Sequence, residues 1–297
     1  MSSFPKAIAV VGPTAAGKTK LGVELSNKFN GEIVSADSRQ VYKYLDISTG
    51  KDKEDYGEVP YHLIDILEPD KEITVADFQK NAFSAIDDIL KRKKLPVVVG
   101  GSPFYVYAII EGWQFPKFEK DEKLRKKLNK LSLLELQNIL QKIDPKAYEN
   151  VDRENSRRLI RAIEVCTLSG QDFEKSKPIS KPRYDFLFLG IKFSNEELKK
   201  RIRKRLEDRL GEGMIEEVKS IVTKKLASYA DLEKMGLEPR FIAYYLQKKI
   251  NKRELEDLLL KNIYHFAKRQ MTWFRKDKRI QWVKNTREAE EAVRNFL

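Results

Sequence analysis

The chain has 297 residues, and its hydrophobic fraction of 41% is enough for one large α/β domain or for a core with a smaller insert. One cysteine and two histidines exclude a disulfide framework and a thiolate-rich zinc site. The net charge of +13 favours a polyanionic partner, either nucleic acid or an anionic membrane surface, although solvated lysine-rich helices would give the same excess.

The first third of the chain alternates between strand and helix patterns. The apolar run Ala7–Val11 predicts a buried parallel strand, and the four-residue spacing of Leu21, Leu25 and Phe29 predicts a helix after it. A second strand is expected within 32–38. Thr74 and Asp77 form a capping box that begins the next helix, and a third strand follows at 95–102.

Two further strands are expected near 186–193 and 279–284, whereas the stretch between the third and fourth strands contains only helix patterns. Alternating strands and helices indicate βαβ units and a parallel sheet covered on both faces. We therefore predict an α/β core with a P-loop nucleoside-triphosphate-hydrolase-like parallel sheet. The core is formed by 1–115 and 186–297, and a mainly helical insert occupies 116–185.

The segment between the first strand and the first helix reads GPTAAGKT, which has the spacing of a phosphate-binding P-loop. Backbone N–H groups and the helix start would face phosphate oxygens, Lys18 would reach the terminal ones, and Thr19 would ligate Mg²⁺ through its hydroxyl. The motif does not say which phosphate compound is bound. The expected ligands are Gly12, Pro13, Thr14, Ala15, Ala16, Gly17, Lys18 and Thr19.

A carboxylate is expected beside this loop at the end of the second strand. Nucleotide-hydrolysing enzymes usually place an aspartate after an apolar strand to hold magnesium, but VVVGGS at 97–102 ends without one. Asp37 closes the second strand and is expected at the carboxyl edge of the sheet, where ligands bind, although a turn aspartate is an equal alternative. Gln40 offers an amide pair for a base edge or occupies an exposed helix position.

Six motifs in order resemble the tRNA dimethylallyltransferase family, which prenylates an adenine beside the anticodon. They are GPTAAGKT, SADSRQVYKYLDISTGK, PYHLID, GGSPFY, NSRRLIRAIEV and AKRQMTWFR. The resemblance covers nearly the whole chain. It implies transfer of a dimethylallyl group from dimethylallyl diphosphate to N6 of the adenine 3′ to the anticodon, in tRNAs that read codons beginning with U.

The resemblance also implies roles for single residues. Lys18 and Thr19 are expected to act on the diphosphate, Asp37 matches the general base, and Arg240, placed by its spacing to the Tyr245-Leu246 pair, matches an arginine that holds the leaving group. Ser102 stands where the family usually has threonine. The expected tRNA contacts are Asp37, Ser38, Arg39, Gln40, Ser102, Arg157, Arg158, Leu159, Ile160, Arg161, Lys268, Arg269 and Gln270.

Three basic segments, at 157–161, 199–209 and 268–279, favour RNA over a membrane surface, although each one alone suits a solvated helix face. Trp273, within the last segment, is expected in the core. No apolar stretch is long enough for a membrane span and no signal peptide is recognisable, so we expect a cytoplasmic protein that acts as a monomer. A P-loop kinase and a non-catalytic RNA-binding protein remain the alternatives.

Overall fold

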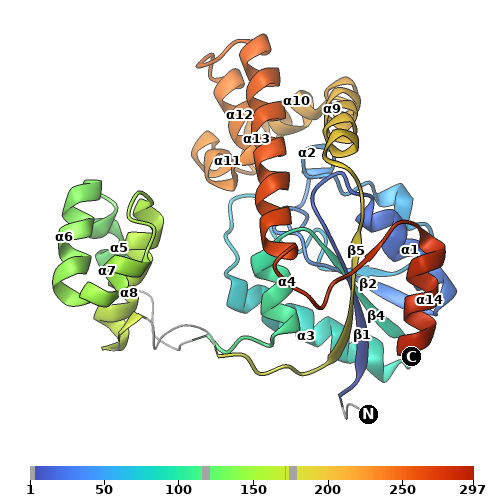
Figure 1. The fold of residues 1–297 in the computed structure, drawn as a ribbon. Helices are drawn as coiled ribbons and strands as arrows, with labels where there is room; N and C mark the ends of the chain where they lie inside the picture. The colour runs from blue at the N-terminus through green and yellow to red at the C-terminus, as the bar shows by residue number, and fades with distance from the viewer. Residues whose placement is uncertain (1–3, 116–120, 171, 174–178) are drawn as a thin grey trace. The chain divides into compact units, whose positions relative to one another are not determined.

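The computed structural model describes residues 4–115, 121–170, 172–173 and 179–297 (Figure 1). It contains two compact units. The core unit consists of Met1–Glu111 with Pro182–Leu297, and the insert unit is Gly112–Lys181. The sequence predicted boundaries of 116 and 185 for this insert, and each boundary of the insert unit lies four residues earlier in the chain.

A parallel sheet forms the centre of the core unit, and its strand order within the described residues is β3-β2-β4-β1-β5-β6. The strands are β1 (Lys6–Val11), β2 (Gly31–Ser35), β3 (Tyr61–His62), β4 (Leu95–Gly100), β5 (Asp185–Ile191) and β6 (Gln281–Val283). β1 pairs with β4 on one side and with β5 on the other, and all of it beyond Lys6 is buried. The parallel α/β fold predicted from sequence is confirmed.

Of the strands in the sheet, β3 is the one that the sequence does not predict. It has two residues, which are too few for an alternating or apolar pattern to be recognised. It pairs in parallel with β2 at Ile33 and Val34. A strand this short owes its conformation to the neighbour it pairs with rather than to its own residues.

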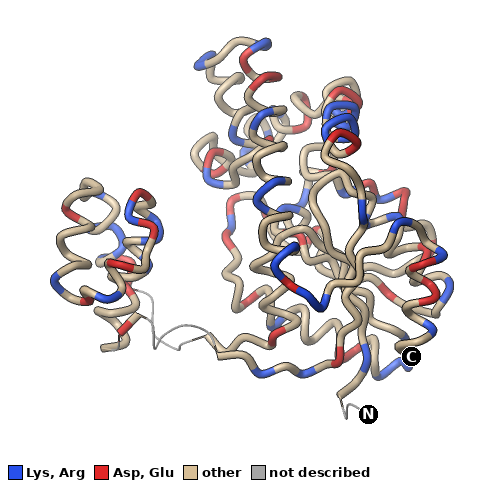
Figure 2. Tube along the Cα trace, in the orientation of Figure 1, with Lys and Arg blue, Asp and Glu red and all other residues tan. Residues whose placement is uncertain are grey.

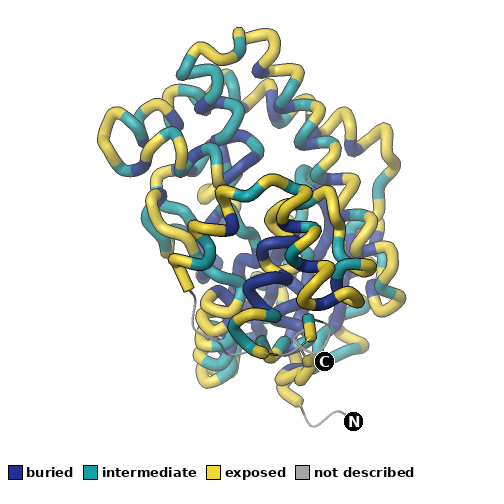
Figure 3. The backbone as a smooth tube through the Cα atoms, turned by 90° about the vertical axis from the view of Figure 1, so that its left-hand side faces the viewer, coloured by how far each residue is buried: buried dark blue, intermediate teal, exposed yellow. Residues whose placement is uncertain are grey.

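Helices cover both faces of the sheet, and buried positions run through the sheet and the inner sides of these helices (Figures 1 and 3). α1 (Lys18–Lys28) and α14 (Thr286–Phe296) share one apolar cluster with the strands, through residues such as Leu25 and Val293. α3 (Val75–Lys91) and α4 (Pro103–Ile110) lie against the other face.

A second apolar core lies among the remaining helices of the core unit. Leu198, Ile202 and Leu206 recur every four residues and place one side of the long helix α9 (Asn195–Gly211) in this core. The other elements of this part are α2 (Asp46–Thr49), the 3₁₀ helix η1 (Lys53–Tyr56), α10 (Met214–Thr223), α11 (Tyr229–Met235), α12 (Leu237–Leu246) and α13 (Lys252–Phe274). Among the described residues, no helix combines the length and hydropathy needed to cross a membrane.

The insert unit consists of α5 (Glu122–Leu128), α6 (Leu133–Ile143), α7 (Pro145–Asn150) and α8 (Ser156–Ser169). Its core contains Leu136 and Leu140 of α6 packed with Leu159 of α8. A capping box at Ser132 and the N-cap side chain of Asn155 begin α6 and α8, because each satisfies backbone N–H groups that the first helical turn leaves unpaired.

Candidate active site

The P-loop connects β1 to α1 at the carboxyl edge of the sheet and borders a cavity of about 360 Å³. The ends of β2 and β4 meet at this same edge, because carboxyl ends of parallel strands lie together. The lining residues used below are Thr14, Ala15, Ala16, Gly17, Lys18, Thr19, Asp37, Gln40, Thr49, Gly50, Asp52, Arg201, Lys204, Arg205, Asp208 and Gln270. Gly12 and Pro13, also predicted as ligands, do not line it.

Lys18 supplies the first cation of the cavity. It is the first residue of α1, so it lies beside N–H groups that have no intrahelical partner, and its Nζ donates to the carbonyl of Pro13 (2.7 Å). Burial lowers the pKa of Lys18 to about 8; the Asp37 carboxylate opposes this shift and Arg205 adds to it. Within the described residues Lys18 forms no ion pair, so its ammonium is available to an anion.

Gln270 of α13 holds the P-loop against the end of β4. Its Oε1 accepts from the Thr14 N–H (2.9 Å), and its Nε2 donates to the carbonyl of Gly101. A Cβ on Gly101 would lie 2.6 Å from Gln270 Nε2 and 3.0 Å from the Gly12 carbonyl oxygen, so a side chain at this position would displace the Gln270 amide. Gln270 is 2% exposed, so this predicted tRNA ligand is placed as a clamp between protein segments.

Asp37 follows β2 and enters the cavity with few partners. Its Oδ1 accepts from the Arg39 N–H (2.8 Å), which is the hydrogen bond of a short turn, and it forms no ion pair among the described residues. Ser102, at the end of β4, supports this turn because its Oγ accepts from the Ser38 N–H (3.2 Å). A half-buried carboxylate beside Lys18 can therefore accept a proton from a group that enters the cavity.

Gln40 is buried, and both ends of its amide contact protein groups. Its Oε1 accepts from the Ser35 hydroxyl (2.8 Å), and its Nε2 donates to the carbonyl of Gly50 (2.8 Å). The structure therefore gives this predicted base-reading residue a position in the wall of the cavity.

α9 contributes a cation that the sequence analysis missed. Arg205 donates to the hydroxyl of Thr14 and, within the described residues, pairs with no carboxylate. Burial, with the adjacent Arg209 as the next cause, lowers the pKa of Arg205 to about 10. Lys18 and Arg205 thus place two cations in one cavity, neither with a carboxylate partner in the described part of the chain, an arrangement suited to a multiply charged anion.

The basic face of α9 is the reason that Arg205 was assigned to RNA. Figure 2 shows Lys and Arg concentrated along this helix. Arg201 and Lys204 also line the cavity, but each pairs with an acid on its own helix, Glu197 (2.9 Å) and Asp208 (3.1 Å) respectively. The arginines 201, 205 and 209 are four residues apart, which places them on one face of α9. This spacing was the signal in the sequence that they face the same site.

Arg240 lies at the start of α12, outside the lining of the cavity. Its Nε donates to the carbonyl of Glu233 (2.8 Å). Arg39 lies beside it, since a Cβ on Gly236 would be 3.2 Å from one guanidinium and 3.5 Å from the other. The role of Arg240 in holding the leaving group stays a prediction.

The predicted metal ligand Thr19 lines the cavity, as does Tyr56. Among the described residues, no three His, Cys, Asp or Glu side chains cluster as a metal cage. Mg²⁺ does not require such a cage, because it is commonly held by one or two protein oxygens together with substrate phosphates and water. The single hydroxyl beside a phosphate-binding loop therefore fits Mg²⁺.

The predicted tRNA residues of the insert unit fall into two groups on α8. Arg157, Arg158 and Arg161 are exposed, whereas Leu159 and Ile160 are packed in the apolar core of the unit. Of the predicted tRNA residues in this stretch, the three arginines are therefore the ones exposed to solvent.

On α13, Lys268 and Arg269 are exposed beside the buried Gln270. Trp273 is 51% exposed, so the expectation that it belongs to the core is wrong, and its neighbour Phe274 occupies the core position. The residues from 275 to 279 add further Lys and Arg positions at this end of the helix (Figure 2). Exposed cations with an aromatic side chain suit contact with single-stranded RNA.

The sheet, the P-loop and the unpaired cations define an α/β protein that binds a chain of phosphates. The chain belongs to the IPP transferase family, whose model matches residues 40–277. It is 42% identical to tRNA dimethylallyltransferase 2 of Shewanella sediminis over 94% of this chain and 93% of that protein. It is also 42% identical to tRNA dimethylallyltransferase 2 of Treponema denticola, over 95% of this chain and 97% of the other.

Solved structures agree with this assignment. A tRNA isopentenylpyrophosphate transferase from Bacillus halodurans has a TM-score of 0.72 and 34% identity, covering 98% of this chain and 95% of that one. A eukaryotic dimethylallyltransferase described as acting on tRNA has a TM-score of 0.78 and 25% identity, covering 91% of this chain and 69% of the other. The family resemblance inferred from the sequence is confirmed.

Proposed function

We propose that the protein transfers a dimethylallyl group from dimethylallyl diphosphate to N6 of the adenine 3′-adjacent to the anticodon, in tRNAs that read codons beginning with U, and releases diphosphate. One observation carries this proposal. The same cavity contains two cations without carboxylate partners, Lys18 and Arg205, and a carboxylate, Asp37, that forms no ion pair among the described residues.

The carboxylate answers the first chemical difficulty, the weak nucleophilicity of adenine N6. The lone pair of this amine is delocalised into the ring, so the amine must lose a proton as it attacks. Asp37 accepts that proton while the new C–N bond forms, a contribution typically worth about 10²–10⁴-fold. The Ser102 contact with the turn at Ser38 keeps the carboxylate in place.

The cations answer the second difficulty, which is the departure of diphosphate. As the allylic C–O bond breaks, its electron pair leaves with the diphosphate, and negative charge grows on the phosphate oxygens. Lys18, Arg205 and the P-loop N–H groups stabilise this charge. A magnesium ion held by Thr19 and the phosphates supplies further positive charge when it is bound.

The nucleic acid must present an unstacked base, because a base inside a stack cannot reach a cavity behind a P-loop. We propose that Arg157, Arg158 and Arg161 of the insert unit, together with Lys268 and Arg269, bind the phosphates of the anticodon stem-loop. We also propose that the protein acts as a monomer in the cytoplasm.

The test is incubation with radiolabelled dimethylallyl diphosphate and unmodified tRNA, followed by nuclease digestion to locate the label. We expect one labelled adenosine next to the anticodon and none in a tRNA with guanosine at that position. If no label is found on the tRNA, the proposed transferase activity is rejected. A parallel incubation with radiolabelled ATP separates the kinase alternative, in which phosphate is transferred and the prenyl diphosphate has no effect.

A further inference from the structure

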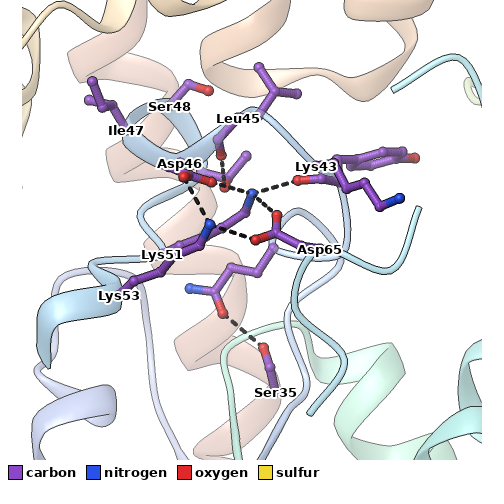
Figure 4. Close-up of polar contacts among 12 residues, drawn as sticks. Ser35, Lys43, Leu45, Asp46, Ile47, Ser48, Lys51, Lys53 and Asp65 are labelled. Carbon is purple, nitrogen blue, oxygen red and sulfur yellow. Dashed lines mark hydrogen bonds and ion pairs between the residues drawn. The ribbon is translucent and has the colours of Figure 1, made fainter. Parts of the chain in front are cut away.

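Lys51 has a fully buried side chain in the wall of the core unit, which is rare for lysine. Its Nζ donates to the carbonyl of Tyr42 (2.6 Å), to Asp46 Oδ1 (2.7 Å) and to Asp65 Oδ1 (Figure 4). An ammonium group has three hydrogens, and all three are used in these contacts. Lys51 therefore has no hydrogen left for a substrate.

The two aspartates also bind a second lysine. Lys53 Nζ lies 2.9 Å from Asp46 Oδ2 and 2.6 Å from Asp65 Oδ2, but its side chain is 37% exposed. We call these four side chains, Lys51, Lys53, Asp46 and Asp65, the Lys51 cluster. Its two positive charges are balanced by its two negative charges. Lys51 is the one fully buried member of the cluster, and the cost of removing its charge from water offsets much of its attraction to the two aspartates.

The cluster fastens three segments that are separate in the sequence. Tyr42 follows the turn after β2, Asp46 begins α2, and Asp65 follows β3. Backbone bonds support the same junction, since the Asp65 N–H donates to the carbonyl of Gln40 (3.1 Å). The loop from Gln40 to Asp52 is thus closed on itself beside the cavity.

This loop forms part of the cavity wall. Gln40, Thr49, Gly50 and Asp52 line the cavity, and Gly50 directly precedes Lys51. The Gly50 carbonyl accepts from Gln40 Nε2 (2.8 Å), so the position of Lys51 sets the position of Gly50 and of the Gln40 amide.

Gly50 in turn supports α9. A Cβ on Gly50 would overlap the guanidinium of Arg209, which shows that this side chain rests directly on the Gly50 backbone. Arg209 is 6% exposed and pairs with Asp52 (3.3 Å), which lies two residues after Gly50. Arg205, one turn before Arg209 on the same helix, is the cation that reaches the P-loop.

We propose that Lys51 is a positioning residue for the leaving-group end of the cavity. It holds Gly50, and through Gly50 and Arg209 it sets the place of Arg205 relative to the P-loop. This inference rests on the proposed function only in naming the anion as the diphosphate of the prenyl donor.

The test compares Lys51→Met with Lys43→Met. Lys43 belongs to the same loop but forms an exposed pair with Glu68 (2.6 Å), so its replacement controls for loss of a charge from this segment. Binding of inorganic diphosphate is measured by calorimetry, with thermal unfolding as the check on folding. The Michaelis constants for prenyl donor and for tRNA are measured separately.

We expect Lys51→Met to weaken inorganic diphosphate binding and to raise KM for the donor by about tenfold or more, a difference of about 1.4 kcal/mol. KM for tRNA should stay within twofold, and Lys43→Met should match the unaltered protein throughout. A loss of stability alone would not separate the two substrates in this way.

Lys51→Met leaves two aspartates to the single charge of Lys53. A second variant, Lys51→Met with Asp65→Asn, restores the charge balance by keeping the Lys53–Asp46 pair, and it serves if Lys51→Met does not fold. A folded form of either variant with unaltered diphosphate affinity would overturn the positioning role. Diphosphate binding by the unaltered protein without transfer of label rejects the proposed function and leaves the positioning role measurable. Absence of diphosphate binding by the unaltered protein rejects both.

Discussion

Arg205 donates a hydrogen bond to the hydroxyl of Thr14, and this bond joins α9 to the P-loop across 191 positions of the chain. The contact brings a guanidinium to a loop whose own cation, Lys18, also lacks a carboxylate partner within the described residues. Two such cations repel each other, and Arg205 is one cause of the lowered pKa of Lys18. An anion bound between them would relieve this repulsion.

Replacement of Arg205 is expected to weaken donor binding. Arg205→Met should reduce affinity for inorganic diphosphate about 10- to 100-fold, because a desolvated cation next to the phosphate site is lost. Arg203→Met is the matched control, since Arg203 is exposed on the same helix and does not line the cavity. Calorimetric titration with diphosphate measures both, and equal affinities would remove Arg205 from the site.

Asp37→Asn should reduce the rate of transfer about 10²- to 10⁴-fold while affinity for tRNA stays within threefold. The amide keeps the shape of the side chain and can still accept from the Arg39 N–H, but it cannot take a proton from N6. Single-turnover transfer of label and a tRNA gel shift provide the two measurements. Full activity in this variant would show that another group is the base.

The variant Gln270→Glu distinguishes two roles for Gln270, a clamp between the P-loop and the end of β4 or a ligand for tRNA. The carboxylate can still accept from the Thr14 N–H but cannot donate to the Gly101 carbonyl, and it adds negative charge near the diphosphate. We expect KM for the donor to rise about tenfold or more and tRNA affinity to stay within threefold. The reverse pattern, weaker tRNA binding with an unchanged donor KM, would favour the role predicted from sequence.

The pKa of Glu32 predicts how the free energy of unfolding depends on pH. It is 3% exposed, and although burial opposes the shift, hydrogen bonds with His62, Lys94 and Arg92 lower its pKa to about 2. Its contribution is therefore complete above the unfolded-state pKa of about 4.5 and is lost as the pH falls towards 2.

Glu32→Gln should lower the free energy of unfolding by about 2 kcal/mol at pH 7, a value reduced for the partial exposure of the cationic partners. The difference from the unaltered protein should shrink by more than half at pH 3. Urea denaturation at the two pH values measures it, with Glu58→Gln, an exposed position, as the control. A difference that does not change with pH would contradict the assignment.

Much of the fold and part of the site follow from sequence, because they depend on local patterns. The runs at Ala7–Val11 and Leu95–Gly100 form buried parallel strands wherever they pack, and the P-loop takes its shape from its own residues and the helix after it. Asp37 was predictable because a residue that ends a parallel strand lies at the ligand-binding edge whatever the order of the strands.

Tertiary structure alone decides the roles of residues whose partners are distant in the sequence. Gln40 and Gln270 look like ligands for RNA in the sequence, yet in the structure their amides bridge protein segments. The α9 pattern predicts which face is apolar but not what its basic face meets, so Arg205 was missed. No sequence pattern predicts that Lys51 is buried. Its burial depends on Asp46 and Asp65 converging from separate segments, which only the packing of the strands and loops produces.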